Sequence, residues 1–212
     1  MPGLTRLYHK TNPGPYGRRG YPGNCEGMLI RDLLRYFQHA SVFDPMTGSG
    51  TCRDVCLELG IRCDSADLHG GFDACDPSRY EGLGPFDFVW VHPPYWRQKV
   101  YSADPRDMSQ AQTLAAFLDQ YEVLIANCAR LLAPRGKLAI LMGDCTDRES
   151  RLYPADLPHQ ATRFRGGAGA VLHRYHPLQP RRHQWSQGLP LVLYCHRALK
   201  TSQSGRNEKQ PF

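Results

Sequence analysis

Apolar side chains recur along the chain with two different periods. Segments 28–37 and 113–132 place them three or four positions apart, as an amphipathic helix requires, and segment 52–59 has helical character up to Gly60. Short apolar runs with the length of buried strands stand at 41–43, 61–66, 86–91, 137–142 and 189–196. Strands that alternate with helices predict an α/β fold, in which a doubly wound, mostly parallel sheet carries helices on both faces.

The length of the chain, 212 residues, fits one domain with a full hydrophobic core. We expect this domain to span 1–200, with an N-terminal arm at 1–27, a basic insertion at 146–187 and a flexible tail at 201–212. No stretch contains the roughly 20 apolar residues that span a bilayer, and the N-terminus lacks the apolar core of a signal peptide. These features predict a cytoplasmic protein.

The cysteines stand singly within the predicted elements. There are eight of them, Cys25, Cys52, Cys56, Cys63, Cys75, Cys128, Cys145 and Cys195. None forms the Cys-x-x-Cys pair with which zinc sites usually begin. The pattern therefore predicts reduced, mostly buried thiols and no metal site.

Positive charge is concentrated towards the C-terminus. Residues 1–146 contain 15 Lys and Arg against 16 Asp and Glu, whereas residues 147–212 contain 11 against 4, which together give the totals of 26 and 20. A basic segment of this kind neutralises phosphates, so it suggests a polyanion as partner. A basic face that is merely solvated fits the same counts.

Polar residues stand where the predicted strands end. Asp44, Asp67, His92 and Asp144 each follow an apolar run. In parallel α/β sheets, ligands bind at the carboxyl ends of the strands. We therefore expect one pocket that is assembled from these distant positions.

The segment 44–51, Asp-Pro-Met-Thr-Gly-Ser-Gly-Thr, links the first strand to a helix. Its glycines, Gly48 and Gly50, let a small-molecule cofactor approach the backbone where the chain turns. No Gly-Lys-Ser/Thr follows, as a phosphate-binding loop would need, and the dinucleotide pattern Gly-x-Gly-x-x-Gly is absent. Asp44 in front of the turn favours a ligand with a positive charge.

Acidic positions further along suit the rest of such a cofactor. Asp67 is placed to accept hydrogen bonds from ribose hydroxyls, with a helix-cap role or a contribution from Asp64 as the alternatives. Phe72 and Asp73 suit an adenine ring, which they would hold by stacking and hydrogen bonding, and Asp76 competes for that role.

The apolar run 86–91 ends at the turn His92-Pro93-Pro94-Tyr95. The two prolines fix the backbone and remove two amide donors, which leaves carbonyl oxygens at the turn ready to accept hydrogen bonds from a substrate. Tyr95 offers an aromatic face for stacking. Such a turn suits an amino group on a planar ring.

The two motifs together, Asp-Pro-x-x-Gly-Ser-Gly-Thr at 44–51 and x-Pro-Pro-Tyr at 92–95, resemble the amino-methylating DNA methyltransferases. Enzymes of this family use S-adenosylmethionine to methylate N6 of adenine or N4 of cytosine in double-stranded DNA. The similar region covers about residues 16–144. The resemblance implies a seven-stranded, Rossmann-like methyltransferase sheet. It also implies that the cofactor is bound by Tyr21, Pro22, Asn24, Asp44, Pro45, Met46, Gly48, Ser49, Gly50, Thr51, Asp67 and Asp73.

The resemblance further implies that His92, Pro93, Pro94 and Tyr95 form the catalytic turn. The Pro93 carbonyl and the His92 side chain would accept hydrogen bonds from the target amino group and direct its lone pair at the sulfonium methyl. The family usually has aspartate, asparagine or serine where this chain has His92. A neutral imidazole has one acceptor nitrogen and a protonated one has none, so we expect methylation to fall as His92 becomes protonated.

Recognition of DNA has to come from a small part of this chain, which has no room for a large recognition domain. The target base would be rotated out of the duplex and would stack on Tyr95. The chain offers the loop 101–108 and the segment 148–187 for this role, so we expect a short recognition site in the DNA, or help from a second subunit in a homodimer. Further substrate-binding residues are expected at Trp96, Tyr101, Arg163, Arg165, Arg181 and Arg182.

Two other functions fit the same motifs. An x-Pro-Pro-Tyr turn suits any planar amino or amide nitrogen, so RNA and protein glutamine are alternative substrates, although such enzymes usually have asparagine in the first position. The other alternative is a non-catalytic DNA-binding partner subunit that keeps the fold. His92 favours this alternative, and the intact glycine turn opposes it.

Overall fold

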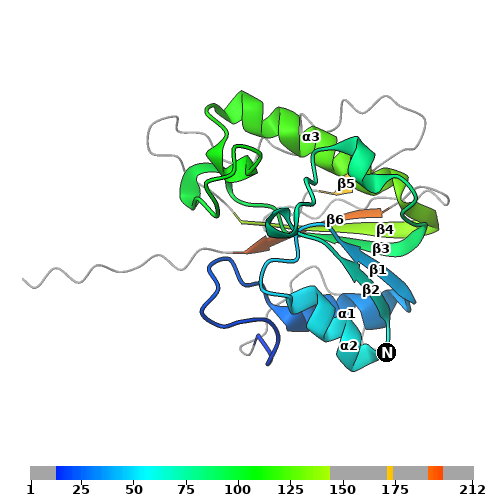
Figure 1. Ribbon diagram of the computed structural model, residues 1–212. Coiled ribbons are helices and arrows are strands. Elements are labelled where there is room, and N and C mark those ends of the chain that lie inside the picture. The colour runs from blue at the N-terminus through cyan, green and yellow to red at the C-terminus, as the bar shows by residue number, and fades with distance from the viewer. Residues whose placement is uncertain (1–12, 144–170, 174–190, 198–212) are drawn as a thin grey trace, which may run out of the picture.

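A computed structural model describes residues 13–143, 171–173 and 191–197 of the chain (Figure 1). Its helices are α1 (Gly27–Phe37), α2 (Thr51–Leu59) and α3 (Leu114–Arg130), and its strands are β1 (Ser41–Asp44), β2 (Arg62–Ser65), β3 (Phe86–Val91), β4 (Leu132–Gly143), β5 (Val171–His173) and β6 (Leu191–Arg197). Short 3-10 helices, η1 (Leu68–Gly70), η2 (Pro77–Tyr80), η3 (Trp96–Gln98) and η4 (Met108–Gln110), lie in the connections. Within the described residues, no helix is both long and apolar enough to cross a membrane.

The strands form one sheet in the order β2-β1-β3-β4-β6-β5, and every neighbouring pair is parallel. Helices α1 and α2 cover one face of this sheet, and α3 covers the other (Figure 1). The predicted α/β fold with a parallel sheet is therefore confirmed. The expected count of seven strands is wrong for the part of the chain that the structure describes, where the sheet has six.

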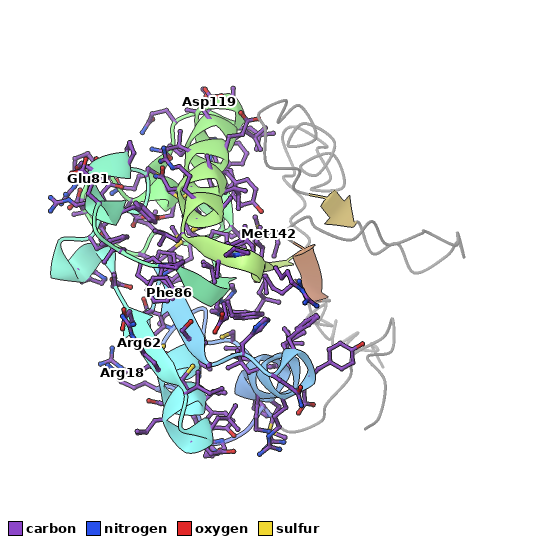
Figure 2. All side chains as sticks on the ribbon, turned by 90° about the vertical axis from the view of Figure 1, so that its right-hand side faces the viewer. Arg18, Arg62, Glu81, Phe86, Asp119 and Met142 are labelled. Carbon is purple, nitrogen blue, oxygen red and sulfur yellow. The ribbon has the colours of Figure 1, made fainter. Side chains whose placement is uncertain are left out.

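Strand β3 connects the two layers of the core. Because side chains alternate along a strand, Val89 and Val91 pack on the α3 side, whereas Phe88 and Trp90 pack on the side of α1 and α2. All four of these side chains are buried. Figure 2 shows the side chains of both layers, with Phe86 labelled on the sheet at the start of β3. A central strand that is apolar on both faces is typical of a parallel sheet between two helical layers.

The junction between α3 and β4 differs from the prediction. The periodicity predicted a helix up to residue 132 and a strand only from 137, but the helix ends at Arg130 and β4 already begins at Leu132. Leu132 pairs with Phe86, and the next pair, Lys137 with Phe88, comes after a shift in register. Residues that the local sequence assigns to a helix end therefore belong to β4, because they pair with β3. The residues between Leu132 and Lys137 outnumber those between Phe86 and Phe88, so the strand is irregular there.

The described part of the N-terminal arm, residues 13–26, is attached to α2. Tyr16 is buried and its hydroxyl donates to Glu58 Oε2 at 2.5 Å. The Gly17 amide donates to Asp54 Oδ2 at 2.9 Å. These bonds hold the arm beside the glycine turn that precedes α2.

Candidate functional site

A pocket opens at the carboxyl ends of the central strands. Strand β2 follows β1 in the chain and lies on one side of it, whereas β3 lies on the other side. The direction of the strand order therefore reverses at β1. Asp44 from the end of β1, Asp67 beyond β2 and His92 beyond β3 all line this pocket. Three of the four predicted strand-end positions are therefore brought together, as expected at a topological switch point. Asp144 lies outside the described residues.

The glycine turn between β1 and α2 requires its glycines. Gly48 and Gly50 adopt positive φ angles of 49° and 86°, which are strained for residues with a Cβ. A Cβ on Gly48 would also lie 3.1 Å from the Tyr21 ring. Both Gly48 and Tyr21 line the pocket. The turn therefore brings bare backbone to the pocket wall, as the sequence predicted.

Asp67 links the glycine turn to the end of β2. Its carboxylate accepts the Gly48 amide at 2.9 Å and the His69 amide at 3.0 Å, so it caps η1 and also lines the pocket. The rival Asp64 lies within β2, pairs with Arg62 at 2.6 Å and is absent from the pocket wall. A carboxylate has about four acceptor sites, so the cap leaves Asp67 with capacity for hydroxyl groups of a ligand.

Asp44 is the most buried acid of the pocket, with 2% of its surface exposed. It accepts the Met46 amide at 3.0 Å. Burial raises the pKa of the Asp44 carboxyl to about 8, because the charged form loses its hydration. A positively charged ligand would reverse this effect, which makes Asp44 complementary to a cation.

Acidic side chains predominate in the pocket wall. Asp44, Asp67, Asp73 and Asp107 line it, and among the lining residues that the structure describes Arg106 is the only lysine or arginine. Arg106 is itself paired with the neighbouring Asp104 at 2.6 Å. The lining therefore favours a cationic ligand over a phosphate-bearing one.

Phe72 and Asp73 form the wall next to the glycine turn. The Phe72 ring packs edge-on against Phe43 and Tyr80, with centroids 5.8 and 5.2 Å apart. Asp73 accepts the Cys75 amide at 2.8 Å. The competitor Asp76 caps η2 instead and is not among the lining residues. An aromatic side chain beside a carboxylate suits a flat ring with an amino group.

Asn24 supports the glycine turn from the arm. Its Oδ1 accepts hydrogen bonds from Ser49 Oγ at 2.8 Å and from Thr51 Oγ1 at 2.5 Å. The pocket wall includes most of the predicted cofactor residues, namely Tyr21, Asp44, Pro45, Met46, Gly48, Ser49, Thr51, Asp67 and Asp73. It does not include Pro22, Asn24 or Gly50, so Asn24 is placed as a residue that positions its neighbours.

The His-Pro-Pro-Tyr turn contributes His92 and Pro94 to the same wall. His92 Nε2 lies 2.9 Å from Tyr95 Oη, and the two rings meet edge-on at 5.6 Å. Pro93 is buried, and Tyr95 is partly buried against the core. Neither Pro93 nor Tyr95 is among the residues that line the described pocket.

Trp96 is placed away from the pocket wall. Its indole N–H donates to the Ala111 carbonyl at 2.9 Å, and the Arg97 guanidinium lies over its ring at 4.7 Å. These contacts join η3 to the loop before α3. The predicted substrate role of Trp96 stays a prediction, because the structure shows it only as an anchor of this loop.

The loop 101–108, which the sequence offers for recognition of the target, forms one wall of the pocket. Tyr101 lines the pocket as a predicted residue, and Ser102, Arg106, Asp107 and Met108 line it as well. Asp107 is 6% exposed and shapes the loop by accepting the amides of Ser102 and Ser109 at 2.7 and 2.9 Å. The spacing of Asp107 and Ser109, Asp-x-Ser, is typical of a turn in which the aspartate accepts the amide two residues later.

Tyr101 also meets the N-terminal arm across the pocket. Its ring centroid lies 6.4 Å from that of Tyr21, and a Cβ on Gly23 would lie 2.4 Å from its hydroxyl. Burial raises the pKa of both Tyr21 and Tyr101. Segments from two distant parts of the sequence thus border one pocket.

The predicted DNA-contacting arginines, Arg163, Arg165, Arg181 and Arg182, lie outside the described residues. Of the expected basic insertion at 146–187, the structure describes only β5, a strand that the sequence analysis did not predict. In comparisons with known proteins, the chain matches no family model and no curated protein sequence.

Proposed function

We propose that this protein is an S-adenosylmethionine-dependent methyltransferase that modifies the exocyclic amino group of adenine or cytosine in DNA. The observation that carries the proposal is that the glycine turn and the His-Pro-Pro-Tyr turn, some 40 residues apart, line one pocket at the strand ends. The glycine turn would form the first wall, which binds the cofactor. The His-Pro-Pro-Tyr turn would form the second wall, which accepts hydrogen bonds from the target amino group. The sheet would then be a Rossmann-like methyltransferase sheet.

The residues of the first wall fit the cofactor chemically. When bound, S-adenosylmethionine supplies a methyl group on a positively charged sulfur. Asp44 and the other acids of the wall are complementary to that charge. Asp67 would hold the ribose hydroxyls, and Phe72 with Asp73 would hold the adenine. The missing side chain at Gly48 leaves room for the Tyr21 ring, which lines the same wall.

The residues of the second wall would activate the amino group. Its nitrogen is a poor nucleophile because the lone pair is delocalised into the base. Hydrogen bonds to the Pro93 carbonyl and to His92 would draw the nitrogen towards a tetrahedral geometry and turn the lone pair at the methyl group. The bond between Tyr95 and His92 would hold the imidazole in place for this task.

The DNA would deliver its base by rotating it out of the duplex. Tyr101 lines the same pocket as His92 and Pro94, and we assign base stacking to it. The predicted stacking on Tyr95, with help from Trp96, stays a prediction, because neither side chain lines the described pocket. Arg163, Arg165, Arg181 and Arg182 would neutralise phosphates, which makes binding sensitive to salt.

The test is to incubate the protein with methyl-labelled S-adenosylmethionine and, in parallel, with duplex DNA, RNA or protein. The expected result is label in DNA alone. Label in RNA or in protein glutamine would show that the substrate is not DNA but that the protein still transfers methyl groups to a planar nitrogen. Cofactor binding without transfer to any of the three, or no cofactor binding at all, would favour the non-catalytic partner subunit.

A further inference from the structure

Three cysteines that are separate in the sequence meet behind the pocket. Cys52 and Cys56 lie one turn apart on α2, and Cys63 comes from β2. Their sulfur atoms all lie within 4.8 Å of one another. The sequence predicted no metal site because the chain has no Cys-x-x-Cys pair. The fold creates the cluster by packing α2 on β2.

The positions of the sulfurs suit a metal ion at their centre. Three thiolates about 2.3 Å from one ion are about 4 Å apart when they surround it in a plane. The sulfur atoms of the cluster lie within 4.8 Å of one another, so small side-chain movements would bring them to this spacing. Residues four apart on a helix present their side chains on the same face, which fixes two of the three ligands on one rigid element.

The surroundings of the cluster limit its access. Cys52 is 1% exposed and Cys56 is fully buried, whereas Cys63 is partly exposed. An ion would therefore enter past Cys63. Cys52 is the second residue of α2, where the partial positive charge at the start of the helix offsets some of the negative charge of a thiolate.

We propose that Cys52, Cys56 and Cys63 form a binding site for one soft metal ion, with Cu(I) as the matching type. Thiolates select soft ions such as Cu(I) and zinc. In the part of the chain that the structure describes, the cluster has three ligands and no fourth. Zinc sites are almost always four-coordinate, whereas three sulfurs can complete the shell of Cu(I). Binding one Cu(I) releases the three thiol protons and involves no change of oxidation state.

This site is independent of the proposed methyl transfer but adjoins it. Cys52 lines the pocket as well as belonging to the cluster, and it follows Thr51 of the glycine turn directly. Cys56 and Cys63 are not among the pocket-lining residues. Substitutions at these two positions therefore test metal binding without removing a side chain from the pocket.

The experiment is an anaerobic titration of the full-length, fully reduced protein with Cu(I) and, separately, with Zn²⁺. We expect one equivalent of Cu(I) to produce thiolate-to-metal charge-transfer absorption and to protect three thiols from alkylation, with three sulfur neighbours in its X-ray absorption spectrum. Cu(I) binding without protection of Cys52, Cys56 and Cys63, as mapped by mass spectrometry, would overturn the proposal. Tighter binding of Zn²⁺ than of Cu(I) would overturn the three-coordinate assignment.

Matched variants distinguish a metal-binding site from three thiols that only pack against one another. Cys63→Ser changes a partly exposed position. Loss of a residue that only supports a metal ligand costs about 10–100-fold in affinity, so we expect removal of a ligand itself, in Cys63→Ser or in Cys56→Ala, to weaken Cu(I) binding by at least about a hundredfold. Cys128→Ala removes an equally buried thiol from α3, outside the cluster, and should leave Cu(I) binding unchanged. If the Cys56→Ala variant fails to fold, the Cys63→Ser variant tests the site instead, because its substitution is at a partly exposed position. Equal affinity in Cys63→Ser and the unsubstituted protein would contradict the site.

Discussion

The Gly48 amide donates a 2.9 Å hydrogen bond to the Asp67 carboxylate. This bond joins the turn after β1 to the end of β2 at the point where both line the pocket. The Thr47 amide adds a second link, because it donates to the Ala66 carbonyl at 2.9 Å. The shape of the proposed cofactor wall thus depends on contacts between two strand ends.

Replacing Asp67 with alanine should weaken both the fold and the cofactor site. The amides of Gly48 and His69 would lose their acceptor, so we expect a loss of about 1–2 kcal/mol in the free energy of unfolding. Affinity for S-adenosylmethionine should fall by at least about tenfold. Chemical denaturation and calorimetric titration measure the two effects. Asp64→Ala is the control, and it should change little because an exposed ion pair contributes little.

Replacing Gly48 with alanine should weaken cofactor binding for a steric reason. Gly48 has a positive φ, and its new Cβ would lie 3.1 Å from the Tyr21 ring. Gly60 also has a positive φ, of 65°, but nothing lies within 4 Å of its Cβ position. Both substitutions should cost about 1–2 kcal/mol of stability, but Gly48→Ala alone should lower cofactor affinity, by roughly tenfold. Equal affinities for the two variants would remove Gly48 from the cofactor wall.

Binding of a cation beside Asp44 should depend on pH. The pKa of Asp44 is raised to about 8 by burial, so the free protein holds this carboxyl protonated below that pH. A cationic ligand favours the carboxylate, and binding below about pH 8 therefore releases a proton. Affinity for S-adenosylmethionine should fall as the pH drops from about 8 to about 6, by up to about tenfold per unit.

The variant Asp44→Asn is the control for this pH dependence. It should bind the cofactor more weakly than the unsubstituted protein at about pH 8 and should lack the additional slope below it, while any titration of the ligand itself stays common to both proteins. A raised pKa in the folded state also means that stability decreases as the pH rises from the usual aspartate range to about 8. The asparagine variant should lack this decrease. Identical slopes in both proteins would exclude Asp44 from the linkage.

The contact between His92 and Tyr95 should matter for turnover and little for cofactor binding. We expect His92→Ala to abolish most methylation, because it removes an acceptor for the target amino group. Tyr95→Phe removes only the hydroxyl that lies 2.9 Å from His92 Nε2, and it should reduce the methylation rate by about tenfold through loss of orientation. Single-turnover kinetics with saturating cofactor measure both. Full activity of His92→Ala would refute the assigned role.

The sequence predicted those features that depend on local chemistry. The apolar run of β3 predicted a buried strand, and the glycines between β1 and α2 predicted a turn that leads into a helix; both are present, and the glycines of the turn have positive φ. The position of Asp67 at a strand end followed from alternation of the strand residues. Tertiary contacts decided the rest. The start of β4 at Leu132, for example, depends on pairing with Phe86, which no local pattern encodes.

The loop 101–108 and the cysteine cluster likewise depend on tertiary contacts. Residues 101–108 have no periodicity, because hydrogen bonds to the buried Asp107 hold that loop instead of a helix or strand ladder. Cys63 comes within reach of Cys52 only because α2 packs on β2. Such juxtapositions become visible once the topology is known, since they join residues whose sequence neighbours carry no common pattern.

The most direct measurement of the central claim is the identity of the methylated product. Unmethylated duplex DNA is incubated with the protein and methyl-labelled S-adenosylmethionine, digested to nucleosides and analysed by mass spectrometry, with His92→Ala in parallel. The account predicts label in N6-methyladenine or N4-methylcytosine that is lost in the variant, while the variant still binds cofactor. DNA without labelled adenine or cytosine, from a protein shown to bind the cofactor, would contradict it.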